Sequence, residues 1–308
     1  MARGAIMLTA AVRSYVEMRK ACGCSFRIQS SLLRRFAEFS DKKGDHFVRA
    51  NTAVEWAAGA PSVYQRARRL GNVIRLSRYL RAEDARHELP PPVFGSDHRP
   101  RRVPYIFSRE DIQRLVRAAS QSGYRTLRRD TYSTLFSLLA CTGLRVSEAI
   151  NLRYSDINPD GLVIRHSKFK KTRLVALHDT TRTALERYLE RRRSYAPFDD
   201  HVFISLRRKP LLLGSVDHAF RHLVAKLGLQ FPPGMLRPSP HSLRHTFTVR
   251  ALEACPVDRD HVTRHTVALT SYLGHSSVNE TFWYLQGTPD LMTSIAQRCE
   301  HFVTGRQA

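Results

Sequence analysis

The chain has 308 residues, a length typical of two domains, and its 42% hydrophobic content is that of a globular protein rather than a disordered one. Fifty lysines and arginines against 27 acidic residues give a formal net charge of +23, with an excess both before and after residue 100, which favours DNA or RNA as a partner. No apolar run is long enough to span a bilayer and no signal peptide is recognisable, so we expect no membrane partner and a cytoplasmic, nucleoid-associated protein.

Residues 1–88 are predicted to form a helical domain. Apolar residues recur at helical spacing over 8–21, 28–39, 52–58 and 61–81. In the last of these helices, Val63, Ala67, Leu70 and Ile74 form the expected buried stripe.

The helix over 61–81 also contains six arginines and no acidic residue. A charged run usually marks a solvated face, but six cations without an anion in a strongly basic protein favour contact with phosphates. We expect DNA contacts from Arg66, Arg68, Arg69, Arg75 and Arg78.

Residues 89–104 are predicted to be a linker. Five prolines and a glycine prevent a continuous helix. Arg99, Arg101 and Arg102 add positive charge, so the linker is expected to contact the DNA backbone while joining two domains.

The second domain, residues 105–308, is predicted to be mainly helical with one small sheet. Alternating apolar residues over 161–166 and 172–177 indicate a hairpin. The predicted helices cover 108–119, 131–141, 146–152, 180–193, 216–227, 241–254, 262–273, 279–284 and 290–302. The fold class is therefore mainly α with a small β-sheet, in two domains.

Three segments of this domain carry residues suited to phosphate chemistry. In Cys-Thr-Gly-Leu-Arg-Val-Ser-Glu, Arg145 follows a helix-ending glycine, where free backbone N–H groups favour an anion. In Ser-Pro-His-Ser-Leu-Arg-His-Thr-Phe, an N-capping Ser239 and a first-turn proline place His241 and Arg244 on one helix face. In the third segment, His275 follows Leu-Gly and precedes Tyr284 by nine residues.

Taken together, these segments resemble the tyrosine recombinase family, also called phage-integrase-like or Xer-like. The resemblance covers most of residues 105–285 and implies a core-binding domain followed by a catalytic domain. It implies that Arg145 and Arg244 are the catalytic arginines, with Glu148 supporting the first, and that Tyr284 is the nucleophile. The other catalytic residues that it implies are Lys168, His241 and His275.

The chemistry of a phosphodiester explains each residue type. The planar forks of Arg145 and Arg244 suit its non-bridging oxygens, and Tyr284 suits storage of the bond energy as a 3′-phosphotyrosine without ATP. His241 is expected to accept the phenolic proton. Lys168 is expected to protonate the leaving 5′ oxygen, although the neighbouring Lys170 and Lys171 remain alternatives.

No cofactor and no metal are expected. The pairs His241/His245 and His261/His265 have a spacing that allows a shared metal, but no third ligand stands near either pair. The five scattered cysteines are expected to be reduced.

The sequence predicts a site-specific recombinase or integrase acting on double-stranded DNA with paired half-sites. Two rivals stay open: a type IB topoisomerase-like relaxing enzyme and a catalytically silent DNA-binding protein. The spacing before Gly274 is about two helical turns longer than in Xer-type proteins, a departure that affects the expected surroundings of His275. The segment Leu-Gln-Gly-Thr-Pro after Tyr284 resembles recombinases of mobile elements. A homo-tetramer on DNA, with or without related recombinases, is expected, and the helix over 288–303 docks either on its own subunit or on a neighbour.

Overall fold

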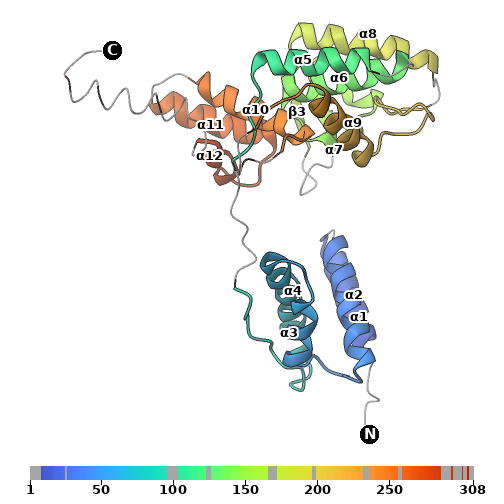
Figure 1. Cartoon of the computed structure of the whole chain (residues 1–308), viewed down its shortest axis with the longest axis vertical. Helices are drawn as coiled ribbons and strands as arrows, with labels where there is room; N and C mark the ends of the chain where they lie inside the picture. The colour runs from blue at the N-terminus through green and yellow to red at the C-terminus, as the bar shows by residue number, and fades with distance from the viewer. Residues whose placement is uncertain are drawn as a thin grey trace. The chain divides into compact units, whose positions relative to one another are not determined.

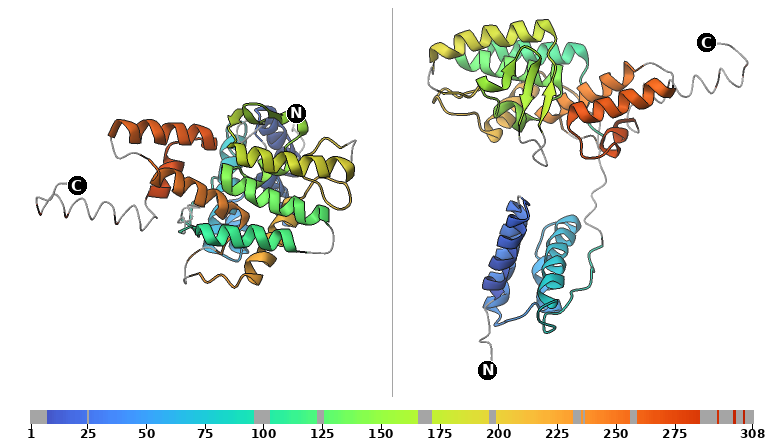
Figure 2. Two further views of the ribbon diagram at one scale, coloured as in Figure 1. Left: turned by 90° about the horizontal axis from the view of Figure 1, so that it is seen from above. Right: turned by 180° about the vertical axis from the view of Figure 1, so that it is seen from behind.

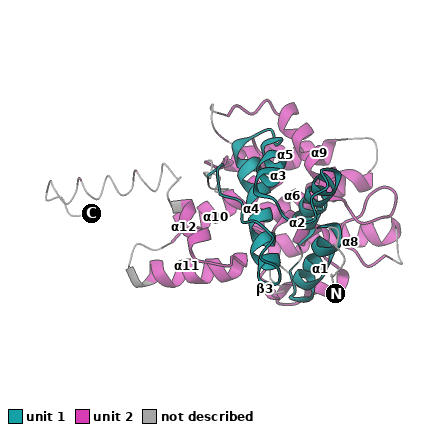
Figure 3. Cartoon of the chain, turned by 90° about the horizontal axis from the view of Figure 1, so that it is seen from below, with its two compact units in different colours: residues 1–101 teal, residues 102–308 magenta. Residues whose placement is uncertain are grey.

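The computed structural model describes residues 8–24, 26–95, 103–122, 126–165, 172–195, 199–231, 235, 237–255 and 259–285, together with 293, 300 and 304. The chain divides into two compact units, residues 1–101 and 102–308 (Figure 3). Within the described residues, the first unit is helical and the second adds a small sheet to its helices (Figure 1), which confirms the predicted fold class.

The described part of unit 1 folds into four helices: α1 (Leu8–Ala21), α2 (Arg27–Lys42), α3 (Ala50–Ala58) and α4 (Val63–Arg81). They enclose a core in which Phe36 and Trp56 make an edge-to-face contact with ring centroids 5.4 Å apart. Ser62 caps α4 by accepting a hydrogen bond from the Gln65 N–H. Each predicted helix is therefore present, with ends that differ by a few residues.

The predicted stripe of α4 is partly wrong. Ala67 and Leu70 are buried, but Val63 is 63% exposed and Ile74 is only half-buried. The buried face continues instead through Val73, Leu76, Ser77 and Leu80. Val63 is the first residue of α4, and its apolar side chain at helical spacing led to the wrong prediction that it is buried.

The first residues of the predicted linker belong to unit 1. Pro90 is buried, and Phe94 packs against the core of this unit. Pro92 and Phe94 also line a small cavity against Gly71 and Arg75 of α4. The packed part of unit 1 thus extends beyond the predicted boundary at residue 88.

Unit 2 is built around α6 (Thr126–Thr142), whose Leu135, Phe136 and Leu139 are fully buried. Figure 2 shows the chain from two further directions. α6 contacts α5 (Arg109–Gln121), α8 (Asp179–Tyr195) and α10 (Pro240–Glu253). The remaining helices are α7 (Val146–Ile150), α9 (Leu213–Lys226), α11 (Arg259–Leu273) and α12 (Asn279–Leu285), with a 3₁₀ turn at Tyr154–Asp156.

The sheet has three antiparallel strands in the order β1 (Ile157–Asn158), β2 (Gly161–Ile164) and β3 (Arg173–Val175). The predicted hairpin is β2–β3, with Val163 paired to Leu174. The short β1 was not predicted, because two residues are too few to show alternation. The hairpin turn, including Lys168, Lys170 and Lys171, lies outside the described residues.

A smaller core joins α10, α11 and α12. It contains Val249, Leu252, Leu269, Leu273 and Tyr284. Apart from two single residues, 293 and 300, the predicted helix over 288–303 lies outside the described residues. Among the helices that the structure describes, none combines the length and apolarity needed to cross a membrane.

Candidate active site

The first candidate arginine is placed by a tight helix end. Gly143 follows α6 with φ +62°, and a Cβ on it would lie 2.5 Å from Cδ1 of Phe247, so the backbone needs glycine there. Leu144 follows, and Arg145 is the capping residue at the start of α7.

Glu148 links two arginines. It accepts hydrogen bonds from the backbone N–H of Arg145 (3.0 Å) and from its Nη1 (2.8 Å). Nη1 and Nη2 of Arg173 in β3 donate to the two carboxylate oxygens at 3.0 and 2.8 Å. Burial alone raises the pKa of Glu148, but the hydrogen bonds from Arg173 and Arg145 outweigh it and lower the pKa to about 2. Glu148 is therefore ionised at neutral pH.

Arg244 is held on α10, which begins as predicted with Ser239 as the capping residue and Pro240 in the first turn. Its side chain is buried, with Nη1 donating to the carbonyl oxygen of Gly143 and Nη2 to that of Leu273, both at 2.7 Å. Burial and the nearby Arg145 lower the pKa of Arg244 to about 10, so it stays a cation.

His275 lies two residues after the end of α11. Gly274 ends this helix with φ +64°, and the His275 N–H donates to the carbonyl oxygen of Thr270 at 3.1 Å. The Nδ1 atom of His275 is hydrogen-bonded to Oγ1 of Thr281 in α12 at 2.8 Å. This bond fixes the ring and directs Nε2 away from Thr281.

Tyr284 lies on α12 and is 5% exposed. Its hydroxyl is 2.7 Å from Nδ1 of His245, one helical turn from His241 on α10. The rings of Tyr284 and His275 are nearly parallel, with centroids 6.3 Å apart. The structure thus brings the candidate nucleophile together with the predicted His275 and with a second histidine, His245.

The three histidines are neutral at physiological pH. Burial and the charges of Arg244 and Arg145 lower the pKa of His241 to about 4, although part of this residue remains exposed. Burial, with smaller effects of His241 and Arg244, lowers the pKa of His245 to about 3. Burial and Arg244 lower the pKa of His275 to about 4. Each ring is therefore available as a proton acceptor or a neutral hydrogen-bond donor.

The structure shows two site residues that the sequence analysis missed. His245 follows Arg244 directly in the sequence and was considered only as half of a metal pair. Arg173 was covered only by the predicted strand over 172–177. The signal for His245 was its spacing of one turn from His241, whereas nothing local in the sequence connects Arg173 to Glu148.

One histidine of each pair whose spacing allows a shared metal is bound to another group. His245 binds Tyr284, and Nε2 of His265 is 2.7 Å from the carbonyl oxygen of Ala251. Within the part of the chain that the structure describes, no group of three or more His, Cys, Asp or Glu side chains is arranged to hold a metal.

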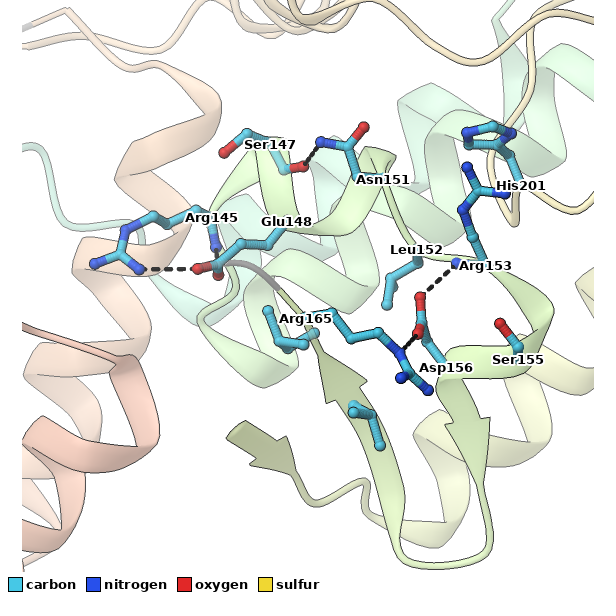
Figure 4. A pocket seen from close by; sticks show the side chains of 12 residues that line it. Arg145, Ser147, Glu148, Asn151, Leu152, Arg153, Ser155, Asp156, Arg165 and His201 are labelled. Carbon is cyan, nitrogen blue, oxygen red and sulfur yellow. Dashed lines mark hydrogen bonds and ion pairs between the residues drawn. The ribbon is translucent and has the colours of Figure 1, made fainter. Parts of the chain in front are cut away.

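A cavity of about 860 Å³ adjoins the Arg145–Glu148 pair (Figure 4). Arg165 on its wall pairs with Asp156 at 2.7 Å. The other polar side chains that line it are Ser147, Asn151, Arg153, Ser155 and His201. A cavity lined by Arg153 and Arg165 as well as Arg145 suits an anionic ligand better than an apolar small molecule.

The predicted DNA-contacting arginines of α4 divide into two groups. Nε of Arg66 donates to the carbonyl oxygen of Ala60, between α3 and α4, at 2.9 Å, and Arg69 lies over the ring of Trp56 in α3, so both have partners within unit 1. Arg75 and Arg78 are exposed, and Arg68 is half-buried. Arg99, Arg101 and Arg102 lie outside the described residues.

The comparisons with known proteins place this geometry in a family. The phage integrase family model matches residues 106–290. The chain is 36% identical over 304 residues to the putative integrase/recombinase y4rB of Sinorhizobium fredii (strain NBRC 101917 / NGR234), covering 94% of this chain and 96% of that protein. It is 30% identical over 239 residues to the tyrosine recombinase XerD of Proteus mirabilis, covering 75% of this chain and 71% of XerD.

The fold is likewise similar to that of a lambda integrase in the crystal structure of a tetramer bound to a Holliday junction. The TM-score is 0.63 at 18% identity, covering 89% of this chain and 79% of that chain. The sequence matches, together with the grouping of Arg145, Arg244, His275 and Tyr284, show that the chain belongs to the phage integrase family of tyrosine recombinases, enzymes that break and rejoin DNA strands.

Proposed function

We propose that this protein is a site-specific recombinase that cuts one DNA strand through a 3′-phosphotyrosyl intermediate and rejoins it to a new partner. The observation that carries the proposal is the grouping of two buried or half-buried arginines with Tyr284. Arg145 and Arg244 lie far apart in the sequence, yet both bond to backbone carbonyls at the end of α11, close to the segment that leads to Tyr284.

In the first step, Oη of Tyr284 attacks the scissile phosphorus. A bond forms between tyrosine oxygen and phosphorus, the bond to the 5′ oxygen breaks, and the phenolic proton passes to a base. The 5′ hydroxyl of a partner strand then attacks the phosphotyrosine and restores both the phosphodiester and the tyrosine. The number of phosphate ester bonds is conserved, so the cycle consumes no ATP.

The arginines stabilise the charge that develops on the non-bridging oxygens. Each guanidinium uses part of its fork for a backbone carbonyl, which sets its direction and leaves other N–H groups for the phosphate. His275, held through Nδ1, presents Nε2 as a further hydrogen-bonding group. Lys168 remains the predicted donor to the 5′ oxygen.

For the base that accepts the phenolic proton, our proposal differs from the expectation from the sequence. His241 was predicted from the motif, but the histidine in hydrogen-bond contact with Tyr284 is His245, and the rings of the two histidines are in contact, with centroids 4.6 Å apart. We therefore assign proton acceptance to this pair, with His245 as the first acceptor. A phosphate placed beside it adds negative charge and raises its pKa, which improves it as a base.

Unit 1 is the proposed DNA clamp, and an assembly of several subunits is the proposed active form. Exposed Arg75 and Arg78 and the basic linker supply phosphate contacts for the clamp. The lambda integrase of similar fold was crystallised as a tetramer on a Holliday junction, and the same arrangement suits a chain that must exchange strands between two paired half-sites.

Covalent capture tests the proposal. The wild-type chain is incubated with a pool of nicked duplexes of randomised sequence, and DNA that stays bound after denaturation is sequenced and used as the substrate thereafter. We expect an adduct with wild type and none with Tyr284→Phe, which keeps the ring in the core while removing the nucleophile. An adduct that persists in Tyr284→Phe assigns the nucleophile elsewhere, and no adduct with wild type supports the silent DNA-binding alternative.

A plasmid assay separates recombination from relaxation. We expect the enzyme to exchange strands between two copies of the captured site and to leave supercoiled plasmids that lack the site unchanged. Relaxation of any plasmid without strand exchange supports the topoisomerase-like alternative.

A further inference from the structure

The end of α11 has an unusual set of hydrogen-bond partners. The last carbonyl groups of a helix have no partner within the helix and need one from elsewhere. Here the N–H groups of Gly274 and His275 satisfy the carbonyls of Ser271 and Thr270. The next three carbonyls are bound by three different arginines.

These arginines come from three separate elements. Nε of Arg173 (β3) donates to the Tyr272 carbonyl at 2.7 Å, Nη2 of Arg244 (α10) to Leu273 at 2.7 Å, and Nη2 of Arg145 (before α7) to Gly274 at 3.0 Å. Cations are favoured at a helix C-terminus, where the backbone dipoles leave a partial negative charge. Both proposed catalytic arginines are thus oriented by one helix end, and the third arginine has no role in the proposed function so far.

Arg173 is placed to support the other two rather than to touch DNA. Its side chain is 10% exposed, and each of its three nitrogens donates within the protein, two of them to Glu148 in a bidentate pair and Nε to Tyr272. A Cβ on Gly274 would lie 2.8 Å from Nη1 of Arg173, so the packing between them is close.

The bidentate pair matters because Glu148 is buried and also binds Arg145. Its side chain is 6% exposed, so its charge must be balanced by partners within the protein. If Arg173 were removed, Arg145 would be the main cation left for this carboxylate. The guanidinium of Arg145 would then be drawn toward Glu148 and away from a bound phosphate.

We propose that Arg173 is a positioning residue for strand cleavage: it satisfies Glu148 and holds the end of α11, and thereby keeps Arg145 directed at the scissile phosphate. This inference rests on the proposed function. It predicts that the loss of Arg173 slows the chemical step by weakening the action of Arg145, and leaves DNA binding by the rest of the protein in place.

The test compares full-length Arg173→Ala and Arg173→Lys with Arg182→Ala. Arg182 is the control, because like Arg173 it donates to backbone carbonyl groups, here those of Asn158 and Pro159, but it lies at the opposite end of the sheet. Thermal unfolding and gel shift on the captured site show whether each variant is folded and binds. Arg173→Lys keeps the charge without the bidentate fork, so it tests geometry even if the alanine variant folds poorly.

Single-turnover cleavage is measured on two substrates, the normal phosphodiester and one with a neutral methylphosphonate at the scissile position. We expect both Arg173 variants to bind within about threefold of wild type and to cleave the normal substrate on the order of 10²-fold more slowly, as for the loss of one charge-stabilising donor. On the methylphosphonate, the cleavage rates of the Arg173 variants should be within about tenfold of wild type. The neutral group carries less negative charge for Arg145 to stabilise. Arg182→Ala should behave as wild type on both.

A double-mutant comparison adds a second readout. If Arg173 acts through Arg145, Arg173→Lys should slow Arg145→Ala little further. Cleavage by the Arg173 variants at near wild-type rate overturns the inference. It is also overturned if the Arg173 variants are slowed equally on both substrates and the effects of the Arg173 and Arg145 substitutions on the cleavage rate are additive. Failure of the wild type itself to form an adduct overturns the proposed function instead, so the two failures are distinguishable.

Discussion

At the scale of single residues, the site combines fixed cations with histidines kept neutral. Arg145, Arg173 and Arg244 carry the positive charge, and Glu148 balances part of it. Burial, together with these cations, lowers the pKa of His241, His245 and His275 to between about 3 and 4. A bound phosphodiester brings the opposite charge, so the protonation of these rings is expected to respond to DNA.

The contact between His245 and Tyr284 leads to a prediction. We expect His245→Phe to slow adduct formation by about 10²-fold, the lower range for the loss of a general base, because the phenolic proton loses its nearest acceptor. Single-turnover adduct formation on the captured site measures this effect, with His265→Phe as a control because that ring binds a carbonyl of α10 instead.

His241→Phe, measured in parallel, separates the two histidines. A wild-type rate in His245→Phe, together with a large defect in His241→Phe, would return the role of base to His241. The contact of His245 would then only hold Tyr284 in the free enzyme.

At the scale of elements, the site depends on helix ends. Gly143 directly follows α6 and its carbonyl binds Arg244, and Gly274 directly follows α11 and its carbonyl binds Arg145. α10, α11 and α12 share a small core that includes Leu273 and Tyr284. Packing in this core therefore determines where the nucleophile and the arginines meet.

The buried histidines on and between these helices are expected to make the stability of the folded state decrease at acid pH. The folded-state pKa values of His245 and His275 lie below the ordinary value of 6.5, so the unfolded chain binds more protons as pH falls. The stability that this provides is present above pH 6.5 and is lost as pH falls toward about 4. We expect each histidine to cost on the order of 1 kcal/mol of unfolding free energy between pH 7 and pH 5.

Denaturant unfolding at several pH values measures this loss. The variant His275→Gln should show a weaker pH dependence than wild type, whereas His178→Gln, at an exposed position, should not differ from it. An unfolding free energy that stays constant between pH 7 and pH 5 would contradict the prediction. Glu148, with its lowered pKa of about 2, should add a further loss only below about pH 4.5.

At the scale of the whole molecule, two units with separate cores divide the proposed work. Unit 2 contains the described site residues, and unit 1 presents exposed arginines on α4. Arg66 and Arg69 have partners within unit 1, so only part of this basic helix is available for phosphates.

This division yields a prediction about salt dependence. We expect Arg75→Ala and Arg78→Ala in the full chain each to weaken DNA binding at low salt and to reduce the slope of log affinity against log salt by about one. Titration by fluorescence anisotropy at several salt concentrations measures this slope. Arg86→Ala is the control, because its exposed side chain already pairs with Asp84 at 2.6 Å.

An unchanged slope in both α4 variants, or an equal loss in the control, would remove α4 from the proposed DNA interface. In that case the basic linker and unit 2 would supply the phosphate contacts.

The sequence alone was sufficient for the helices, the hairpin and most of the candidate site. Helical periodicity and capping residues such as Ser108 and Ser239 are local signals, and the structure shows helices at both places. The motifs around Arg145, Arg244, His275 and Tyr284 predicted the residues that the fold brings together. The roles of Lys168 and of the helix over 288–303 stay predictions.

Only the tertiary structure showed what holds this site in place. Arg145 and Gly274 are 129 residues apart, and Arg173 and Tyr272 are 99 apart, so no local pattern connects them. The same is true of His245, whose bond to Tyr284 spans 39 residues, and of α4, whose buried face depends on the helices around it. Hydrogen bonds to backbone carbonyls leave no trace in residue identity, because every residue has a carbonyl group; which one an arginine reaches is set by the packing of the helices that carry them.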